Sequence, residues 1–216
     1  GVFFGFLLGV FVCVVVGVCC FVGCFGTDIN CPESATFIVP KKPLTLLKNS
    51  LPSTDESLKL SYNSNHLFVK FQETELVCRL IDARFPDYKV VIPTDNPYKL
   101  VVNKNDFQNA LRRVSVFSNK STYQVALNIS GSELQLSAQD VDFSFEGNER
   151  MACQYDGEDL QIAFNAKFLI EMLSAADNND IVMELSTPTK AGIVKPTEKV
   201  ENEELLMLVM PLMLNN

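Results

Sequence analysis

The chain has 216 residues, of which 47% are hydrophobic and 20% charged, the balance of a globular protein with one or two domains. Its net charge of -8 argues against binding nucleic acid through bulk charge, although a net charge hides local patches. Its seven cysteines include no CxxC pair and no Cys/His cluster at metal spacing, which argues against a zinc site or a disulfide framework and favours reduced thiols.

The first 26 residues contain only Gly, Val, Phe, Leu and Cys. An uncharged stretch of this length could cross a bilayer, which needs about 20 residues, but no basic segment precedes it as in a signal peptide. These five residue types are among the six that codons made only of G and T encode. We therefore interpret residues 1–26 as corrupted sequence that, as written, suits strands. An A or a C in those codons would contradict this interpretation.

The next segments predict a strand, a helix and a meander. A short apolar strand before Pro40 leads into a helix over residues 41–50. Residues 57–82 alternate apolar and polar side chains, with turns at 63–65 and near Glu73, which is typical of antiparallel strands. Residues 84–97 form a proline-rich connector, the best candidate for a domain boundary.

The second half predicts a similar alternation of elements. A strand over residues 98–102 precedes a helix in which Phe107, Leu111 and Val114 recur at helical spacing. Four strands follow, over residues 122–130, 133–139, 141–157 and 160–164. A helix over residues 165–176, a hairpin over 180–196 and a strand over 204–214 complete the chain.

One pattern occurs three times, as "FIVPKKPLTLLKNS", "LVVNKNDFQNALRR" and "IAFNAKFLIEMLSA". Each has strand residues, then a helix that starts at Pro40, Asn103 or Asn165, at intervals of 63 and 62 residues. Asn suits these starts because its side chain accepts a hydrogen bond from free helix N–H groups. The period predicts an α+β fold of repeated strand–helix–antiparallel-strand units.

The first two of these helices are basic. Residues 40–50 carry three lysines and no acid, and residues 103–120 carry four basic residues against Asp106, so the rest of the chain carries -14. The basic residues are Lys41, Lys42 and Lys48, then Lys104, Arg112, Arg113 and Lys120. Helices with ordinary solvating charge remain an alternative. The repetition favours a basic surface that follows a phosphate backbone without recognising bases.

The sequence contains no recognisable catalytic constellation. His66, the single histidine, lies in a predicted strand without a nucleophile motif beside it, and no P-loop, G-x-S-x-G, H-E-x-x-H or G-x-G-x-x-G occurs. We assign the acidic pairs Asp140/Asp142 and Glu203/Glu204 to solvent contacts. We therefore expect no catalytic residue, metal site or cofactor, and a binding or scaffold protein.

Four features together resemble the bacterial DNA polymerase III beta subunit, the sliding-clamp family, and most closely its Bacteroidetes members. They are the repeat, "RFPDYKVVIP", "FNAKFLIEML" and "VMPLML", and the resemblance spans Thr27 to Leu214. It implies a DNA-clamp fold with helices on one face of the sheets. It also implies a partial middle domain over 1–92, a C-terminal domain over 93–216, and a missing N-terminal domain.

The resemblance implies a cytoplasmic, non-catalytic processivity factor that encircles duplex DNA as a homodimer ring. Its partners would be the DNA polymerase III alpha subunit, the clamp loader and other proteins with clamp-binding motifs. Two other interpretations remain open: a membrane-anchored, β-rich surface protein with residues 1–26 as its anchor, and, more remotely, an enzyme.

Three sets of site residues follow from the resemblance. The peptide-binding groove, between the middle and C-terminal domains, would use Phe21, Pro86, Val91, Asn165, Phe168, Val209, Met210, Pro211 and Leu212. The DNA-facing residues would be Lys41, Lys42, Lys48, Lys104, Arg112, Arg113 and Lys167, and the subunit interface would use Val116 and Phe117. The chain departs from the family at Val90 and Met213, where the family often has Arg.

Overall fold

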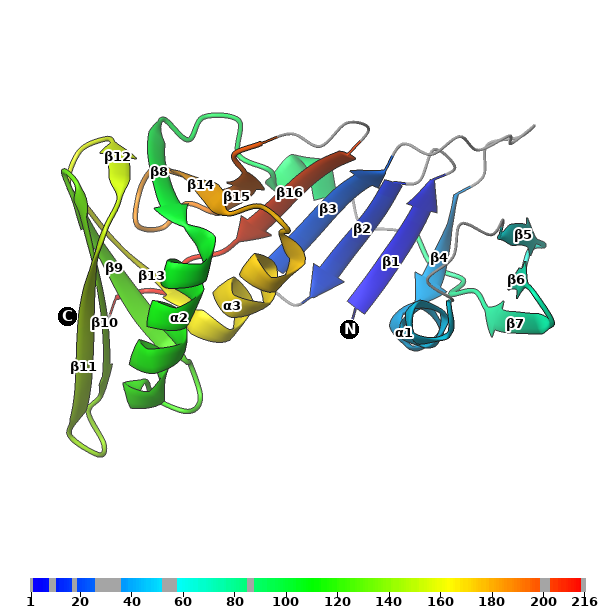
Figure 1. The fold of residues 1–216 in the computed structure, drawn as a ribbon, viewed down its shortest axis with the longest axis horizontal. Coiled ribbons are helices and arrows are strands. Elements are labelled where there is room, and N and C mark those ends of the chain that lie inside the picture. The colour runs from blue at the N-terminus through cyan, green and yellow to red at the C-terminus, as the bar shows by residue number, and fades with distance from the viewer. Residues whose placement is uncertain are drawn as a thin grey trace. The chain divides into compact units, whose positions relative to one another are not determined.

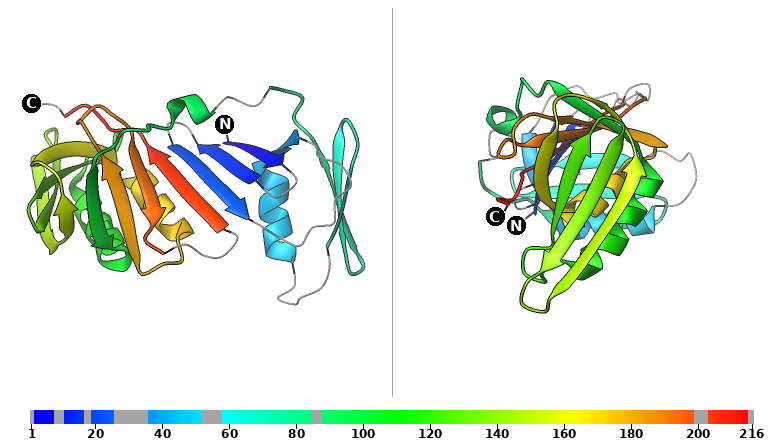
Figure 2. Two further views of the ribbon diagram at one scale, coloured as in Figure 1. Left: turned by 90° about the horizontal axis from the view of Figure 1, so that it is seen from above. Right: turned by 90° about the vertical axis from the view of Figure 1, so that its left-hand side faces the viewer.

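The computed structural model describes residues 2–7, 11–16, 19–25, 36–51, 58–84, 88–198 and 203–214. The chain divides into two compact units (Figures 1 and 2). Unit 1 comprises Gly1–Asp87 with Asn202–Glu204, and unit 2 comprises Tyr88–Glu201 with Leu205–Asn216.

The opening segment of unit 1 forms three strands: β1 (Val2–Leu7), β2 (Phe11–Val16) and β3 (Cys19–Phe25). β1 pairs antiparallel with both β2 and β4 (Thr36–Pro40), and β2 pairs antiparallel with β3. Val and Phe favour strands, which explains why this apolar segment is extended. The described residues of this segment form strands and not one long helix. Among the described residues, no helix is long and apolar enough to cross a bilayer.

The rest of unit 1 confirms the predicted helix and meander. The helix α1 (Lys41–Ser50) follows directly on Pro40, whose φ of -62° suits a helix start. β5 (Lys59–Tyr62), β6 (His66–Phe71) and β7 (Thr74–Arg79) pair in sequence as an antiparallel sheet. The inner face of this sheet packs against Val39 of β4 and against Leu44 and Leu47 of α1.

Unit 2 contains two groups of antiparallel strands. β8, β14, β15 and β16 lie side by side in that order, with β12 on the outer side of β8, and the second sheet has the order β11-β10-β9-β13. The strands are β8 (Tyr98–Asn103), β9 (Gln124–Ser130), β10 (Glu133–Asp140), β11 (Phe145–Ala152), β12 (Gln154–Asp156), β13 (Leu160–Asn165), β14 (Asp180–Leu185), β15 (Gly192–Pro196) and β16 (Glu203–Val209). A short 3-10 helix, η1 (Tyr88–Val91), precedes them.

The segment between β10 and β13 differs from its prediction. Residues 141–144 form a turn with Ser144 at a φ of 54°, and β11 begins only at Phe145. The chain then leaves this sheet, because β12 pairs with Lys99–Val101 of β8. Asp140 is also not a solvent contact, since it is buried and its carboxylate accepts a hydrogen bond from the Asp142 N–H. The pairing of β12 with β8 explains why the alternating pattern of residues 141–157 does not form one continuous strand.

Two helices pack together on the sheets of unit 2 (Figure 1): α2 (Lys104–Val114), continued by η2 (Ser115–Phe117), and α3 (Ala166–Ala175). Both predicted N-caps are confirmed. The Asn103 side chain accepts a hydrogen bond from the Asp106 N–H, and the Asn165 side chain accepts one from the Lys167 N–H. Between the helices, the Gln108 amide donates to the Ile170 carbonyl and to the Ser174 hydroxyl. This polar link fixes the helices against each other.

Candidate functional site

The C-terminal segment crosses from one sheet of unit 2 to the other. β16 ends at Val209, although the sequence predicted a strand through residue 214. Pro211 has no N–H to donate, which explains why the ladder stops beside it. The Leu212 N–H then donates to the Ala163 carbonyl of β13 at 2.7 Å, as an isolated bridge. The crossing places the end of the chain against β13.

The side chains of this segment differ sharply in exposure. Val209 is fully buried, and its side chain lies close to Gly192, so it can support a binding surface but not form its outer wall. Met210 is 39% exposed and Leu212 is half-buried, whereas Met213 is 77% exposed. Met210 and Leu212 are therefore the apolar side chains of this segment that are both anchored and accessible.

Asn165 and Phe168 lie at the same end of β13. The Asn165 side chain accepts hydrogen bonds from the N–H groups of Lys167 and Phe168, at 3.0 and 3.4 Å, and donates to the Thr122 carbonyl at 2.8 Å. Ala163, the partner of Leu212, comes two residues before Asn165 in β13. The structure thus places the Leu212 backbone beside β13, two residues before the Asn165 that caps α3.

Of the remaining predicted groove residues, Phe21, Pro86 and Val91, only Val91 has a described side chain. Val91 is exposed on η1. Phe21 lies in β3, but its side chain is outside the described part of the structure, as is Pro86.

Two of the predicted DNA-facing residues are engaged within unit 2. The Lys104 ammonium donates to the Ala176 carbonyl at 2.7 Å, at the C-terminal end of α3, where a cation also interacts favourably with the helix dipole. Arg113 forms a bidentate ion pair with Glu149 of β11, in which the Arg113 Nε atom lies 3.0 Å from Glu149 Oε2. Lys104 is half-buried by this contact, whereas the Arg113 side chain stays 61% exposed beside Glu149.

Four other predicted DNA-facing residues are less constrained. Lys41 and Lys42 are exposed on α1, and Arg112 is exposed with only a 3.3 Å hydrogen bond to Asn109. The Lys167 ammonium lies 3.4 Å from the centre of the Tyr123 ring. The interaction with this ammonium lowers the pKa of Tyr123 from its ordinary value. The Lys48 side chain lies outside the described residues.

Glu149 and Tyr123 are the residues of this surface that sequence analysis missed. Glu149 is 36 positions from Arg113 in the sequence, and no motif joins them. Tyr123 has a φ of 49°, a left-handed conformation uncommon outside glycine, at the end of the loop after η2. Only the return of the chain through β13 to α3 places Lys167 over its ring.

The Arg113–Glu149 pair makes stability depend on acid pH. Hydrogen bonds from Arg113 hold the pKa of Glu149 below its ordinary 4.5. A carboxylate with a lowered folded-state pKa contributes stability above its unfolded-state pKa and loses it as the pH falls through the folded-state value. We therefore expect Glu149→Gln to lower the melting temperature slightly at neutral pH and to flatten its fall below about pH 4.5. An acid dependence identical to that of the original chain would contradict this expectation.

Lys104 is expected to act on stability rather than on DNA affinity. Lys104→Met keeps the aliphatic stem but removes the hydrogen bond to Ala176, at a cost of about 1 kcal/mol in unfolding free energy. Binding of a labelled DNA duplex should keep the same dependence on salt. Arg112→Gln is the matched control, because it should reduce the slope of log K against log[salt] by about 0.9 with little change in stability. A reduced salt slope for Lys104→Met would contradict the assignment.

An apolar surface lies along the free edge of β11. Its members, which we call the β11 apolar edge, are Val116, Phe117, Phe143 and Phe145, all exposed. The Phe117 ring lies directly against Gly147, where any Cβ atom would collide with it. The rings of Phe143 and Phe145 stack at 6.1 Å. The predicted interface residues Val116 and Phe117 therefore belong to a larger surface next to unpaired strand backbone.

The described residues include no set of three or more His, Cys, Asp or Glu side chains placed to hold a metal ion. Two open hollows, of about 480 and 290 Å³, share Asp159, Leu160 and Gln161.

Two family models match the chain. The model "DNA polymerase III beta subunit, central domain" matches residues 24–87, and "DNA polymerase III beta subunit, C-terminal domain" matches residues 89–212. The beta sliding clamp of Haemophilus influenzae is 28% identical over 175 residues, which are 81% of this chain and 48% of that protein. The beta sliding clamp of Borreliella burgdorferi is 28% identical over 191 residues, which are 87% of this chain and 48% of that protein. The chain spans about half the length of these curated relatives.

Solved structures share the fold. The DNA polymerase III beta subunit of Thermotoga maritima is 28% identical with a TM-score of 0.85, over 100% of this chain and 57% of that one. A Pseudomonas aeruginosa sliding clamp bound to griselimycin is 22% identical with a TM-score of 0.90, over 99% of this chain and 57% of that one. The architecture predicted from the repeat is confirmed.

Proposed function

The chain belongs to the DNA polymerase III beta subunit family, and on that basis we propose that the protein is a sliding clamp that encircles duplex DNA as a processivity factor. The match of the two domain models over residues 24–87 and 89–212 carries this proposal. The clamp has no catalytic activity of its own and works in the cytoplasm. Its chemistry is the holding of DNA and of partner proteins.

The cations without an acidic partner supply the DNA-facing surface. They are Lys41 and Lys42 on α1, Arg112 on α2 and Lys167 on α3, with Lys48 as a further member. Exposed cations on helices attract phosphates without recognising bases, so their contacts can exchange as the protein moves along DNA. Lys104 instead links α2 to the end of α3, and Arg113, exposed beside Glu149, remains a proposed member.

The surface around the start of α3 binds short peptides. Its apolar contacts with a peptide come from Met210, Leu212 and Phe168, whose side chains can adapt to different ligands. The course of the C-terminal segment is set by Val209 and Pro211. Asn165 already has its side chain fixed by three hydrogen bonds. Phe21, Pro86 and Val91 are the remaining proposed members. The partners are the DNA polymerase III alpha subunit, the clamp loader and other proteins with clamp-binding motifs.

Ring closure uses a homodimer whose interface includes Val116 and Phe117. Both side chains are exposed beside the free edge of β11, where a strand of another subunit can complete the sheet. We also propose a middle domain over residues 1–92, a C-terminal domain over 93–216, and an origin in the Bacteroidetes group.

Retention on circular DNA tests the proposed function. The protein from the complete open reading frame is loaded onto a nicked circular plasmid by its clamp loader, and the bound fraction is followed by gel filtration. We expect it to remain with the circle and to leave after one restriction cut, because closure around DNA and not affinity holds it. Equal retention on circular and linear DNA would contradict the proposal.

A further inference from the structure

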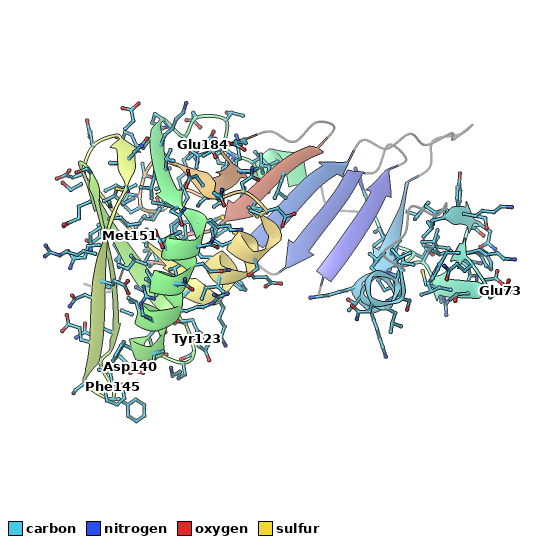
Figure 3. All side chains as sticks on the ribbon, in the orientation of Figure 1. Glu73, Tyr123, Asp140, Phe145, Met151 and Glu184 are labelled. Carbon is cyan, nitrogen blue, oxygen red and sulfur yellow. The ribbon has the colours of Figure 1, made fainter. Side chains whose placement is uncertain are left out.

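The solvent-facing side of the β5–β7 sheet carries more basic than acidic side chains, whereas the whole chain is acidic. Burial alternates along β6, where Leu67, Val69 and Phe71 are buried and the residues between them face outward. The same alternation in β5 and β7 defines what we call the outer sheet face. Its members are Lys59 and Ser61 of β5, His66, Phe68 and Lys70 of β6, and Glu75, Val77 and Arg79 of β7. Figure 3 labels Glu73 in the turn that joins β6 to β7.

The strand register places these side chains in three rows. Lys59 is directly opposite Lys70, and His66 is directly opposite Arg79. Like charges in directly opposite positions destabilise a sheet, so the Lys59–Lys70 pairing is unfavourable in the isolated protein. A local arrangement that lowers stability without a compensating contact is typical of a functional site.

The cations of this face are not neutralised within the chain. Every ion pair among the described residues lies in unit 2, so Lys59, Lys70 and Arg79 have none. Glu75 is opposite Lys70 in the register but is not within ion-pair distance of it. The face therefore carries three cations against one acid, while the whole chain has a net charge of -8. Its ligand should be an anion.

An aromatic and apolar strip runs through the middle of these charges. Phe68 lies between Ser61 and Val77 in the register, and Val77 is 54% exposed. The Phe68 and His66 rings are 6.2 Å apart and tilted by 45°. Aromatic side chains on an open sheet face with cations around them are how several protein modules stack the bases of single-stranded nucleic acid.

We propose that the outer sheet face binds single-stranded nucleic acid. The lysines and Arg79 contact phosphates, and Phe68 with His66 offers ring faces to unpaired bases. A duplex hides its base faces within the stack and would leave Phe68 without a partner, and an acidic peptide has no base to place on the rings. The proposal goes beyond the clamp function and does not rest on it, because the helix cations of the duplex-binding surface are different residues.

Fluorescence anisotropy with a labelled oligothymidylate tests the proposal on the full chain. The variant Lys59→Gln/Lys70→Gln/Arg79→Gln should bind more weakly and lose about 2 from the slope of log K against log[salt], since each single-strand contact contributes about 0.7. Phe68→Leu keeps an apolar side chain at a half-buried position. It should weaken binding about tenfold and leave the salt slope unchanged, because it removes stacking and not charge.

Three controls separate this surface from other sources of binding. Lys99→Gln removes an exposed strand lysine in unit 2 and should leave the affinity unchanged. Arg112→Gln/Lys167→Gln should weaken binding of a duplex but not of oligothymidylate. Lys70→Gln alone serves if the triple variant does not fold by circular dichroism, with a loss of about 0.7 in slope. The proposal would be overturned if folded sheet variants bound oligothymidylate with the affinity and salt slope of the original chain. It would also be overturned if polyglutamate competed as well as unlabelled oligothymidylate.

Discussion

Replacing Phe107 with alanine is expected to lower the free energy of unfolding by about 3–5 kcal/mol. Phe107 is fully buried on the inner face of α2 and is among the largest completely buried side chains of the described residues. Its loss removes apolar surface from the core and leaves a cavity that the sheets and α3 cannot fill, because all are held by backbone ladders and helix contacts. Urea unfolding followed by circular dichroism measures the change.

Phe143→Ala is the matched control for this prediction. Phe143 is the same residue type but is 68% exposed in the turn before β11. Its removal should shift stability by no more than about 0.5 kcal/mol. The urea concentration at the unfolding midpoint should therefore fall for Phe107→Ala and stay unchanged for Phe143→Ala. The dependence of the unfolding free energy on urea should be similar in both variants. Equal midpoints for the two variants would show that α2 does not pack as described.

The double variant Met210→Ala/Leu212→Ala is expected to weaken peptide binding about a hundredfold or more, since buried anchor side chains each contribute about 2 kcal/mol. The Leu212 N–H bonds the Ala163 carbonyl through the backbone, so the substitution removes the side chain and keeps the path of the chain. Isothermal titration calorimetry with griselimycin, which a related clamp binds, measures the loss.

Met213→Ala provides the comparison within the same segment. Met213 is 77% exposed, one residue beyond Leu212, and its truncation should change the affinity by less than threefold or so. Both variants should melt at nearly the original temperature, since neither removes a fully buried side chain. Tight binding by the double variant, or a loss in Met213→Ala as large as in the double variant, would contradict the proposed surface.

Local chemistry explains what could be predicted before the structure. Asn103 and Asn165 could be identified as helix starts because an N-cap bonds to N–H groups only two or three residues further along. The stripe of Phe107, Leu111 and Val114 could be identified because a buried helix face repeats at 3–4 residues, and all three are buried. The β5–β7 meander followed from alternation and from turns inside a short segment.

Some differences between prediction and structure involve contacts between distant parts of the chain. β12 leaves its predicted strand for β8, more than 50 positions earlier in the sequence. The Lys104 ammonium lies at the end of α3, and Arg113 meets Glu149, two contacts that the sequence did not indicate. Positive charge on a helix can be read from sequence, but the presence of an acceptor beside it cannot.

The sequence by itself determined the repeated unit, the two capped helices and the basic character of α1 and α2, because helix capping, side-chain periodicity and charge are properties of short segments. Only the tertiary structure decided that Lys104 meets the end of α3, that Arg113 meets Glu149, and that Leu212 meets β13 beside Asn165. These outcomes depend on hydrogen bonds and ion pairs between residues tens of positions apart. Such pairings form only when the sheets bring the segments together.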